Sequence, residues 1–502
     1  MALPRYFVSV AAALVFAAGC STGPEWDRRV GDENAPKLLA AFGQLSNPEL
    51  TAYVDSVGRR LTEQLPDSPF DYRFTLLDTE TPNAFALPGG HIYVTRGLLP
   101  LLNSEDELAA VLAHEIIHSE SRHAAHQHDR AILPSVLSAP GRMLGRVVPE
   151  AGTILASPWQ VAGGAFLAAH SREHEHQADR LGQNLSAAAG YDPAAMPRFL
   201  TQLAAHQATL VSNPRSPTLF DTHPLTPRRI ALTRQNAAAL AGPPSTRSTA
   251  TRTTDPAPPP PDPAFLDRLN GIVVGPDPAR GLFRGPRFLH PDQRFAVTLP
   301  AGWRPLNTRQ AFGGVAPDGG ALVLFPTAAA PESSPSAAGP SAFDPTAAAQ
   351  PLIDALNKQE IPLLINTVTT HHGRPRHHLR FAAGTLDDGQ TLVLDLLWTV
   401  HGDRLYTQIG AAPRDRLPLL DAVAASFGPL PRDESDRITV RRLRTVRVSD
   451  EAVNTLRAFA GLPGIAASVE ELAAYNATTP ETSLAPDRPV KLVFTEPYRV
   501  AP

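Results

Sequence analysis

LAAVLAHEIIHSESRHAAH, residues 108–126, is the stretch that decides the fold of the first half of this chain. Apolar residues surround both HEIIH histidines, which predicts a helix that is buried on most of its sides. Ser104, followed three residues later by Glu107, has the form of a capping box, so the helix should begin directly after Ser104. His114 and His118 lie four residues apart and therefore project from one helix face, one turn from each other.

The two histidines suggest a metal ion, because buried imidazole and carboxylate groups need polar partners and a metal can supply one. Two neutral imidazoles at this spacing can bind one Zn²⁺, and Glu115 beside the first is placed to take a proton from the metal-bound water. The alternative is a polar helix face without a metal, since the pattern HExxH also occurs by chance on solvated helices.

A second motif, SREHEHQADRLG at residues 171–182, strengthens the metal hypothesis. Glu175 and Asp179 are again four residues apart and share one helix face. A catalytic zinc takes three protein ligands and keeps one position open, so Glu175 can be the third ligand. Asp179 can then accept the outer N–H of a ligand histidine and fix the tautomer of that ring. The alternative is that these carboxylates only balance Arg172 and Arg180 on a solvated face.

HEIIH followed by SRxxExxADxxG resembles the CaaX-endopeptidase (HtpX-like) family of zinc metallopeptidases, of the gluzincin type, and within it the BepA-like periplasmic branch. The resemblance extends over residues 31–240. It implies one catalytic Zn²⁺ held by His114, His118 and Glu175, with Glu115 as general base and proton shuttle. Integral-membrane members of the family carry membrane spans, and no such span follows the N-terminal apolar segment of this sequence.

The segment TPNAFALPGGHIYVTRGLL, residues 81–99, resembles a strand pair of the same family. Asn83, Ala84 and Phe85 would then lie on an edge strand that pairs with the backbone of an extended substrate, a mode that depends little on substrate sequence. The alternative is a plain structural hairpin.

The segment THPLTPRRI, residues 222–230, resembles the His-Pro segment that opens the last helix of the family's domain. His223 would either stabilise an oxyanion at the open zinc position or cap the metal in a latent state. A helix-entry histidine without metal contact is the remaining alternative. Arg228 or Arg229 is expected to brace this segment.

The N-terminus has the features of a secretory signal: Arg5 precedes an apolar run at residues 7–18, and small residues follow. Ala-Ala-Gly19-Cys20 resembles a bacterial lipobox, which predicts that Cys20 is lipidated and tethers the chain to a membrane. Ser21 is compatible with sorting to the outer membrane, so the expected location is the periplasm. The alternative is an ordinary signal peptide with an idle Cys20 thiol. Because Cys20 is the single cysteine, no intrachain disulfide can form.

The 502 residues, 43% of them apolar, predict several domains with real cores, and the 52 prolines cluster in linkers and loops. A net charge of −4 argues against a nucleic-acid surface. The expected division is a signal peptide at 1–20, a metallopeptidase domain at 21–241, a Pro/Thr-rich linker at 242–263, an α+β domain at 264–430 and a small unit at 438–497.

The expected fold class is therefore α+β multidomain, beginning with a mainly helical zincin-type domain that carries a small β-sheet. The domain at 264–430 weakly resembles PsbP-like domains, and a helix is expected to begin at Pro351. The unit at 438–497 weakly resembles a βααβ LysM module, but Ser449 stands in the tripeptide where that module carries Gly-Asp-Thr. Glycan binding by this unit is for that reason in doubt.

The leading hypothesis is a zinc metalloendopeptidase that hydrolyses unfolded or misassembled envelope polypeptides, in periplasmic quality control or outer-membrane assembly. Its expected contacts are the membrane, through the N-terminal lipid, and peptidoglycan or outer-membrane assembly proteins. The alternative is a zinc-containing assembly factor or holdase lipoprotein with latent or no proteolytic activity.

Overall fold

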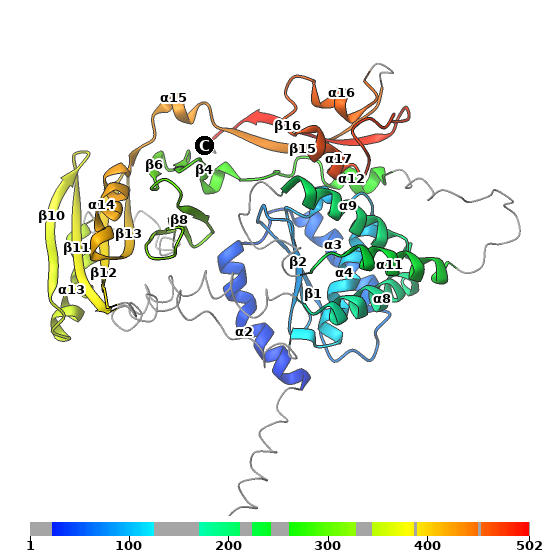
Figure 1. Cartoon of the computed structure of the whole chain (residues 1–502), viewed down its shortest axis with the longest axis horizontal. Coiled ribbons are helices and arrows are strands. Elements are labelled where there is room, and N and C mark those ends of the chain that lie inside the picture. Colours follow the sequence, from blue (N-terminus) through cyan, green and yellow to red (C-terminus); the bar gives the residue numbers. More distant parts are fainter. Residues whose placement is uncertain are drawn as a thin grey trace, which may run out of the picture.

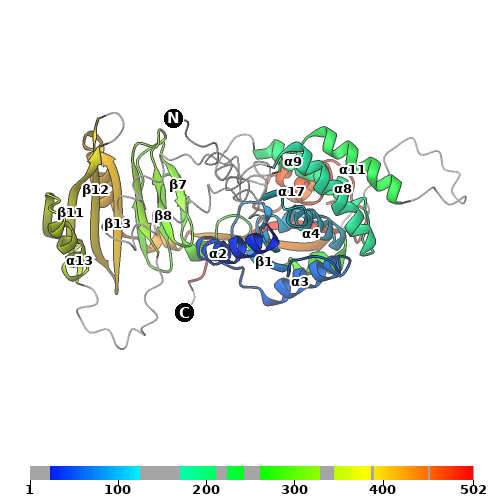
Figure 2. The same ribbon diagram turned by 90° about the horizontal axis from the view of Figure 1, so that it is seen from below.

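The computed structural model describes residues 23–124, 170–210, 223–241, 261–327, 344–385, 389–449 and 453–500. Cys20 and most of the linker 242–263 lie outside the described residues, so lipidation stays a prediction. Helices and strands are mixed, as expected for an α+β chain. A helical half with a small sheet lies at one end of the molecule and larger sheets lie at the other (Figures 1 and 2).

The helical half is built around α4, which runs over Glu105–Glu120. Ser104 Oγ accepts a hydrogen bond from the Glu107 N–H at 3.2 Å, as expected for its N-cap. The Glu107 carboxylate accepts from the Asn103 N–H at 2.8 Å, whereas a capping box would use the N–H of Ser104. The other described helices of this half are α2 (Pro24–Phe42), α3 (Pro48–Thr62), α8 (Arg172–Ala188), α9 (Ala195–Leu210) and α11 (Pro227–Leu240).

The small sheet has the order β1-β3-β2, with β1 at Arg73–Leu77, β2 at Ala84–Leu87 and β3 at His91–Thr95. Strand β1 is parallel to β3, and β2 is antiparallel to β3. Two separate helices, α2 and α3, precede this sheet in the chain. Gly43, with φ of 75°, ends α2, and Asn47 caps α3 by accepting from the Leu50 N–H at 3.0 Å.

Two antiparallel sheets form the other half, in the orders β10-β11-β12-β13-β9-β8-β7 and β14-β6-β5-β4. Helix α13 (Pro345–Lys358) packs on β11 and β12, and α14 (Leu417–Ser426) packs on β13 and β6. The strands are β4 (Leu282–Arg284), β5 (Arg287–His290), β6 (Phe295–Thr298), β7 (Arg304–Asn307), β8 (Ala311–Val315), β9 (Leu322–Pro326), β10 (Leu363–His371), β11 (Arg374–Thr385), β12 (Thr391–His401), β13 (Arg404–Pro413) and β14 (Gly428–Pro429).

The expected start of a helix at Pro351 is wrong, because α13 begins at Pro345. The Asp344 side chain accepts from the Thr346 N–H at 2.8 Å, which supplies an N-cap that Pro351 lacks. Pro351 instead lies inside the helix.

The last unit consists of β15 (Thr439–Arg447), α16 (Leu456–Ala460), α17 (Val469–Tyr475) and β16 (Pro489–Pro497), and its two strands pair antiparallel. This is the element order expected for a βααβ unit. Leu443, Leu472 and Val493 belong to the same buried cluster as Leu108 of α4 and Leu203 of α9. The unit therefore shares its hydrophobic core with the helical half. Figure 1 shows α17 beside α9. The described residues also form two short α-helices, α12 (Pro263–Arg268) and α15 (Arg432–Ser435).

Lys491 of β16 connects this unit to the segment that leads into α4. It is fully buried, and its Nζ donates to the carbonyl oxygens of Pro100 and Leu102, both at 2.7 Å. Burial lowers the pKa of Lys491 to about 7, against the opposing effect of Glu107. We expect Lys491→Ala to lower the free energy of unfolding by about 3–5 kcal/mol, because two buried carbonyl groups and the Glu107 carboxylate lose their cation.

Denaturant unfolding of the full chain measures this effect. Arg457→Ala is the matched control, since Arg457 lies in the same unit but its side chain is 62% exposed in an ion pair with Glu481. The control should change the stability by less than about 0.5 kcal/mol. Equal effects of the two substitutions would contradict a structural role for Lys491.

Candidate metal centre

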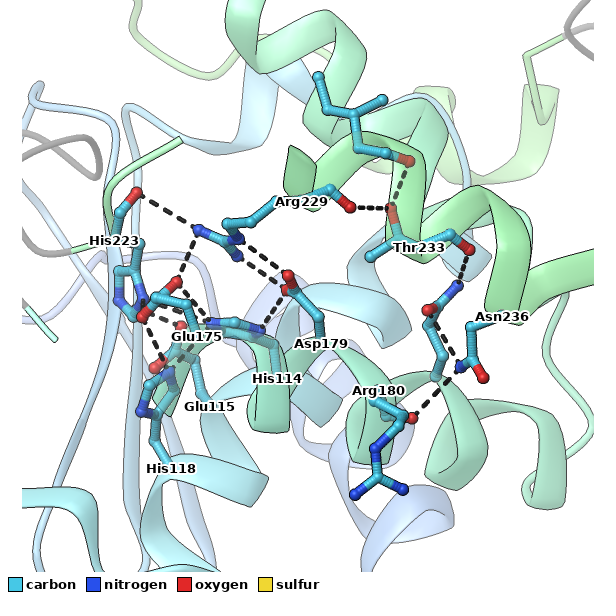
Figure 3. A network of polar contacts seen from close by, with 12 residues as sticks. His114, Glu115, His118, Glu175, Asp179, Arg180, His223, Arg229, Thr233 and Asn236 are labelled. Carbon is cyan, nitrogen blue, oxygen red and sulfur yellow. Dashed lines mark hydrogen bonds and ion pairs between the residues drawn. The ribbon is translucent and has the colours of Figure 1, made fainter. Parts of the chain in front are cut away.

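Four buried side chains from three segments converge at one point in the helical half (Figure 3). His114 and His118 come from α4, Glu175 from α8, and His223 from the segment before α11. Their candidate ligand atoms lie within 4.8 Å of one another. His114 Nε2 is 3.0 Å from His118 Nε2 and 3.3 Å from His223 Nδ1, and Glu175 Oε1 is 3.0 Å from His223 Nδ1.

A cation fits this cluster. The Nε2 atoms of His114 and His118 face each other at 3.0 Å, and their lone pairs would repel without a proton or a cation between them. Glu115 Oε2 and His223 Nε2 are buried and have no hydrogen-bond partner in the described part of the chain. Three imidazoles and one carboxylate form a donor set that suits a transition-series cation.

Arg229 of α11 holds the two carboxylates of α8 in place. Its Nε and Nη2 donate to the two Asp179 oxygens at 2.8 and 2.7 Å, and its Nη1 lies 2.6 Å from Glu175 Oε2. Asp179 Oδ1 is 3.1 Å from His114 Nδ1, the contact expected for a residue that fixes the tautomer of a ligand histidine. Of the two arginines named from the sequence, Arg229 is buried at the cluster, whereas Arg228 is exposed.

The charges around the cluster shift its pKa values in opposite directions. Burial lowers the pKa of His114, but Asp179 and Glu175 outweigh it and raise this pKa to about 10. Burial raises the pKa of Glu175, but His223, His114 and His118 bring it well below its ordinary value. Burial also raises the pKa of Glu115, since that effect exceeds the opposing one of His223. The site thus joins an ionised carboxylate to a second carboxyl group that binds its proton more tightly.

The sequence profile of peptidase family M48 matches residues 48–237, the range that contains all of these side chains. This part of the chain belongs to peptidase family M48. The resemblance to a family of zinc metallopeptidases inferred from HEIIH and SRxxExxADxxG is thereby confirmed. A family of metal-dependent peptidases agrees with the convergence of His114, His118, Glu175 and His223.

Relatives of the M48 domain have names that describe proteases. The chain is 30% identical over 237 residues to the beta-barrel assembly-enhancing protease of Yersinia pestis. The matched region covers 46% of this chain and 48% of that protein. It is 31% identical over 225 residues to the Escherichia coli K12 protein of the same name, covering 44% of this chain and 46% of that protein. The chain thus spans about half the length of these relatives.

A mitochondrial metalloendopeptidase OMA1 of Schizosaccharomyces pombe is 28% identical over 216 residues, covering 41% of this chain and 59% of that protein. Among solved structures, cyanobacterial PsbP from Synechocystis is 14% identical with a TM-score of 0.21, covering 28% of this chain and 91% of that chain. At that score the expected PsbP-like character of 264–430 stays a prediction.

Gly182 lets the two metal-site helices of the M48 domain approach each other. A Cβ at this position would lie 3.1 Å from the His114 backbone nitrogen and 3.2 Å from the Ala113 carbonyl carbon. Contacts this short are rare for real side chains, so a larger residue would push α8 away from α4. Gly182 therefore sets the distance at which Glu175 and Asp179 meet His114.

Strand β2 lies at the edge of the three-stranded sheet and packs against α4. The side chains of the strand that is expected to pair with substrate are themselves part of the fold. Ala84 is fully buried, Phe85 stacks on Tyr93 with ring centroids 5.2 Å apart, and the Asn83 N–H donates to Thr95 Oγ1 at 2.8 Å. Any pairing with substrate at these residues would therefore use the backbone rather than the side chains.

An apolar pocket that is partly open to solvent lies next to the cluster. His114, Glu115, His223 and Arg229 line one part of it. The remaining lining is apolar and comes from α4 and α9: Val111, Met196, Phe199, Leu200 and Leu203. The pocket therefore offers an apolar surface beside the polar groups of the site.

Further histidines of the M48 domain surround His118. His123 Nδ1 lies 2.9 Å from His118 Nδ1, and the His170 ring lies against the His118 ring with centroids 3.9 Å apart. The His174 ring stacks on that of His123 at 4.1 Å. None of the helices in the described ranges combines the length and apolar character that a membrane span requires.

Proposed function

We propose that this chain is a zinc-dependent endopeptidase that hydrolyses unfolded or misassembled envelope polypeptides in the periplasm. One observation carries the proposal: the buried Glu115 carboxylate lies beside a three-histidine, one-carboxylate cluster and an apolar pocket, within an M48 domain. The names of the bacterial relatives, beta-barrel assembly-enhancing proteases, support a role in outer-membrane assembly.

In this proposal His114, His118 and Glu175 hold one Zn²⁺, and Asp179 and Arg229 hold those ligands in place. The ion would supply Lewis-acid polarisation of the scissile carbonyl group. Glu115 takes a proton from the attacking water and delivers it to the leaving amine nitrogen. Its raised pKa suits the first step, because a carboxylate that binds the proton more tightly is the stronger base.

His223 caps the cluster in this arrangement. Its Nδ1 lies 3.0 Å from Glu175 Oε1 and 3.3 Å from His114 Nε2, which supports a place as fourth ligand in a latent state. Its Nε2 is 3.6 Å from Glu115 Oε1, so the ring also stands close to the proposed base. Displacement of His223 would open a position for the substrate carbonyl.

The proposed substrates are extended polypeptides. An edge strand such as β2 offers backbone groups to any unfolded chain, and the apolar pocket favours a large apolar side chain, which folded proteins keep buried. Lipidation of Cys20 would hold the enzyme at the outer membrane, near assembly proteins or peptidoglycan. The alternative of a holdase without proteolytic activity is not favoured, because the matched relatives are named as proteases.

The test uses the purified full-length chain. We expect one zinc per chain by elemental analysis, cleavage of an unfolded protein but not of its folded form, loss of cleavage after chelation, and its return on adding zinc. His223→Ala separates latency from absence of activity, since it should raise cleavage in a capped enzyme. Stoichiometric zinc without cleavage above the chelated sample, in both wild type and His223→Ala, would refute the proposal.

The pocket makes a separate prediction about cleavage sites. We expect Leu200→Phe to reduce kcat/KM by about 10–100-fold for peptides that have Leu or Phe at the position next to the cleaved bond that enters the pocket. The larger Phe side chain narrows the pocket. Peptides with Ala at the same position should be cleaved as before. Mass spectrometry of a peptide mixture measures both. Leu232→Phe, at an exposed position of α11, is the control, and an equal loss for Leu and Ala peptides would exclude the pocket as a specificity site.

A further inference from the structure

We infer that His123 is a positioning residue for the metal site: its Nδ1 accepts the proton of His118 Nδ1, so that His118 Nε2 carries the lone pair that faces the metal. The inference rests on the metal site of the proposed function. His118 is the ligand whose outer nitrogen no carboxylate contacts among the described contacts, whereas His114 has Asp179.

The distances around His118 determine where its proton lies. Its Nε2 is directed at the cluster, 3.0 Å from His114 Nε2 and 3.4 Å from Glu175 Oε1. A neutral imidazole carries one N–H, so a ring that offers Nε2 to a cation must carry its proton on Nδ1. His123 Nδ1 lies 2.9 Å from His118 Nδ1 and must therefore accept that proton.

The same assignment continues without conflict beyond His123. If His123 Nδ1 accepts, its own proton is on Nε2, which lies 3.3 Å from the carbonyl oxygen Oε1 of Gln177. The Gln177 amide nitrogen then donates to Ser121 Oγ at 3.3 Å. One set of proton positions therefore gives a partner to every group in this series of hydrogen bonds, from His118 to Ser121. It is the set that leaves His118 Nε2 unprotonated.

The backbone places His123 at this point by an unusual turn after α4. Arg122 has φ of 52°, a left-handed conformation that is unfavourable for a non-glycine residue. Its guanidinium pairs with the buried Asp27 of α2, which stabilises the turn. His123 is 2% exposed, and the His174 ring stacks on it almost parallel, at 5°. The backbone turn at Arg122 and the stacking of the His174 ring thus both fix the position of the His123 imidazole.

A second cation bound by His118, His123 and His170 is the competing reading, since their nitrogens also lie within 4.8 Å of one another. It would require His118 to lose its Nδ1 proton and bind two ions. The two readings differ in stoichiometry: a positioning role leaves one ion per chain, and a second site gives two.

The test measures zinc affinity of the full-length chain by competition with a chromophoric chelator. We expect His123→Leu to weaken binding about 10–100-fold, because an apolar group leaves the His118 N–H without an acceptor. His123→Asn should recover most of the affinity, since its amide oxygen can accept the same proton. His176→Leu, a half-buried histidine on α8, should bind zinc as wild type does.

Thermal melting of the metal-free variants separates a positioning role from a role in folding. If His123→Leu and His123→Asn melt at the same temperature, a difference between their zinc affinities cannot come from folding, and the inference requires such a difference. Three results would overturn it: unchanged affinity in His123→Leu, equally weak binding in His123→Asn, or two zinc ions in wild type and one in His123→Leu. The assay does not depend on peptide hydrolysis. If zinc affinity falls in His123→Leu and recovers in His123→Asn as expected, but no variant cleaves peptides, the proposed function would be refuted and the role of His123 would remain supported.

Discussion

Glu115→Gln is expected to lower kcat/KM for peptide hydrolysis by about 10²–10⁴-fold while one zinc per chain stays bound. The amide keeps the size of the side chain but cannot take a proton from water. Glu115 is fully buried between His114 and the apolar pocket, so solvent cannot easily replace it as a base. Because Glu115 is not one of the proposed ligands, the metal should be unaffected.

Initial rates on an unfolded protein substrate, together with elemental analysis of the same samples, measure both quantities. Glu120→Gln is the matched control, since Glu120 ends the same helix and accepts from the Tyr72 hydroxyl at 2.5 Å, a bond that an amide oxygen can also accept. The control should retain its rate. A Glu115→Gln enzyme with the wild-type rate would exclude Glu115 as the base.

Glu175→Ala is expected to weaken zinc binding by more than about 100-fold, beyond the range typical of residues that only support a ligand. Glu175 is the carboxylate of the cluster, and its loss also leaves Arg229 with one carboxylate partner instead of two. Bound zinc at 1,000 times its Kd would stabilise the fold by about 4 kcal/mol, and this stabilisation should disappear in the variant.

Chelator competition and denaturant unfolding with and without zinc measure the two effects. Glu173→Ala is the control on the same helix, because Glu173 is exposed, two residues from Glu175. It should bind zinc normally and show the zinc-dependent gain in stability. Undiminished zinc in Glu175→Ala would remove Glu175 from the ligand set.

Much of the candidate site was predictable, because its residues lie at helical spacing within short motifs. HEIIH on an apolar helix, and Glu175 with Asp179 one turn apart, specify which side chains share a face whatever the rest of the chain does. The N-cap at Ser104 was equally local, and the structure contains it. The strand pair at 81–99 was expected from the family resemblance, and β2 and β3 lie there.

The contacts that sequence spacing did not indicate are those between distant segments. His123 acquires a partner in His118 only because Arg122 adopts a left-handed conformation beside Asp27, which is 95 residues away in the chain. The choice between Arg228 and Arg229 depends on how α11 is rotated against α8. Strands such as β7, β8 and β10 were not expected, since short or polar strands lack a clear apolar alternation.

The sequence by itself determined the chemistry of this protein: two helices that each present a pair of polar residues on one face, a carboxylate beside the first histidine, and the family to which residues 48–237 belong. These follow from the helical period, which relates residues four apart without reference to any other segment. Only the tertiary structure brought His223, Arg229 and His123 to that chemistry and joined Lys491 of the last unit to the segment before α4. Such contacts depend on how whole elements pack, and packing is decided by the complete set of buried surfaces rather than by local spacing.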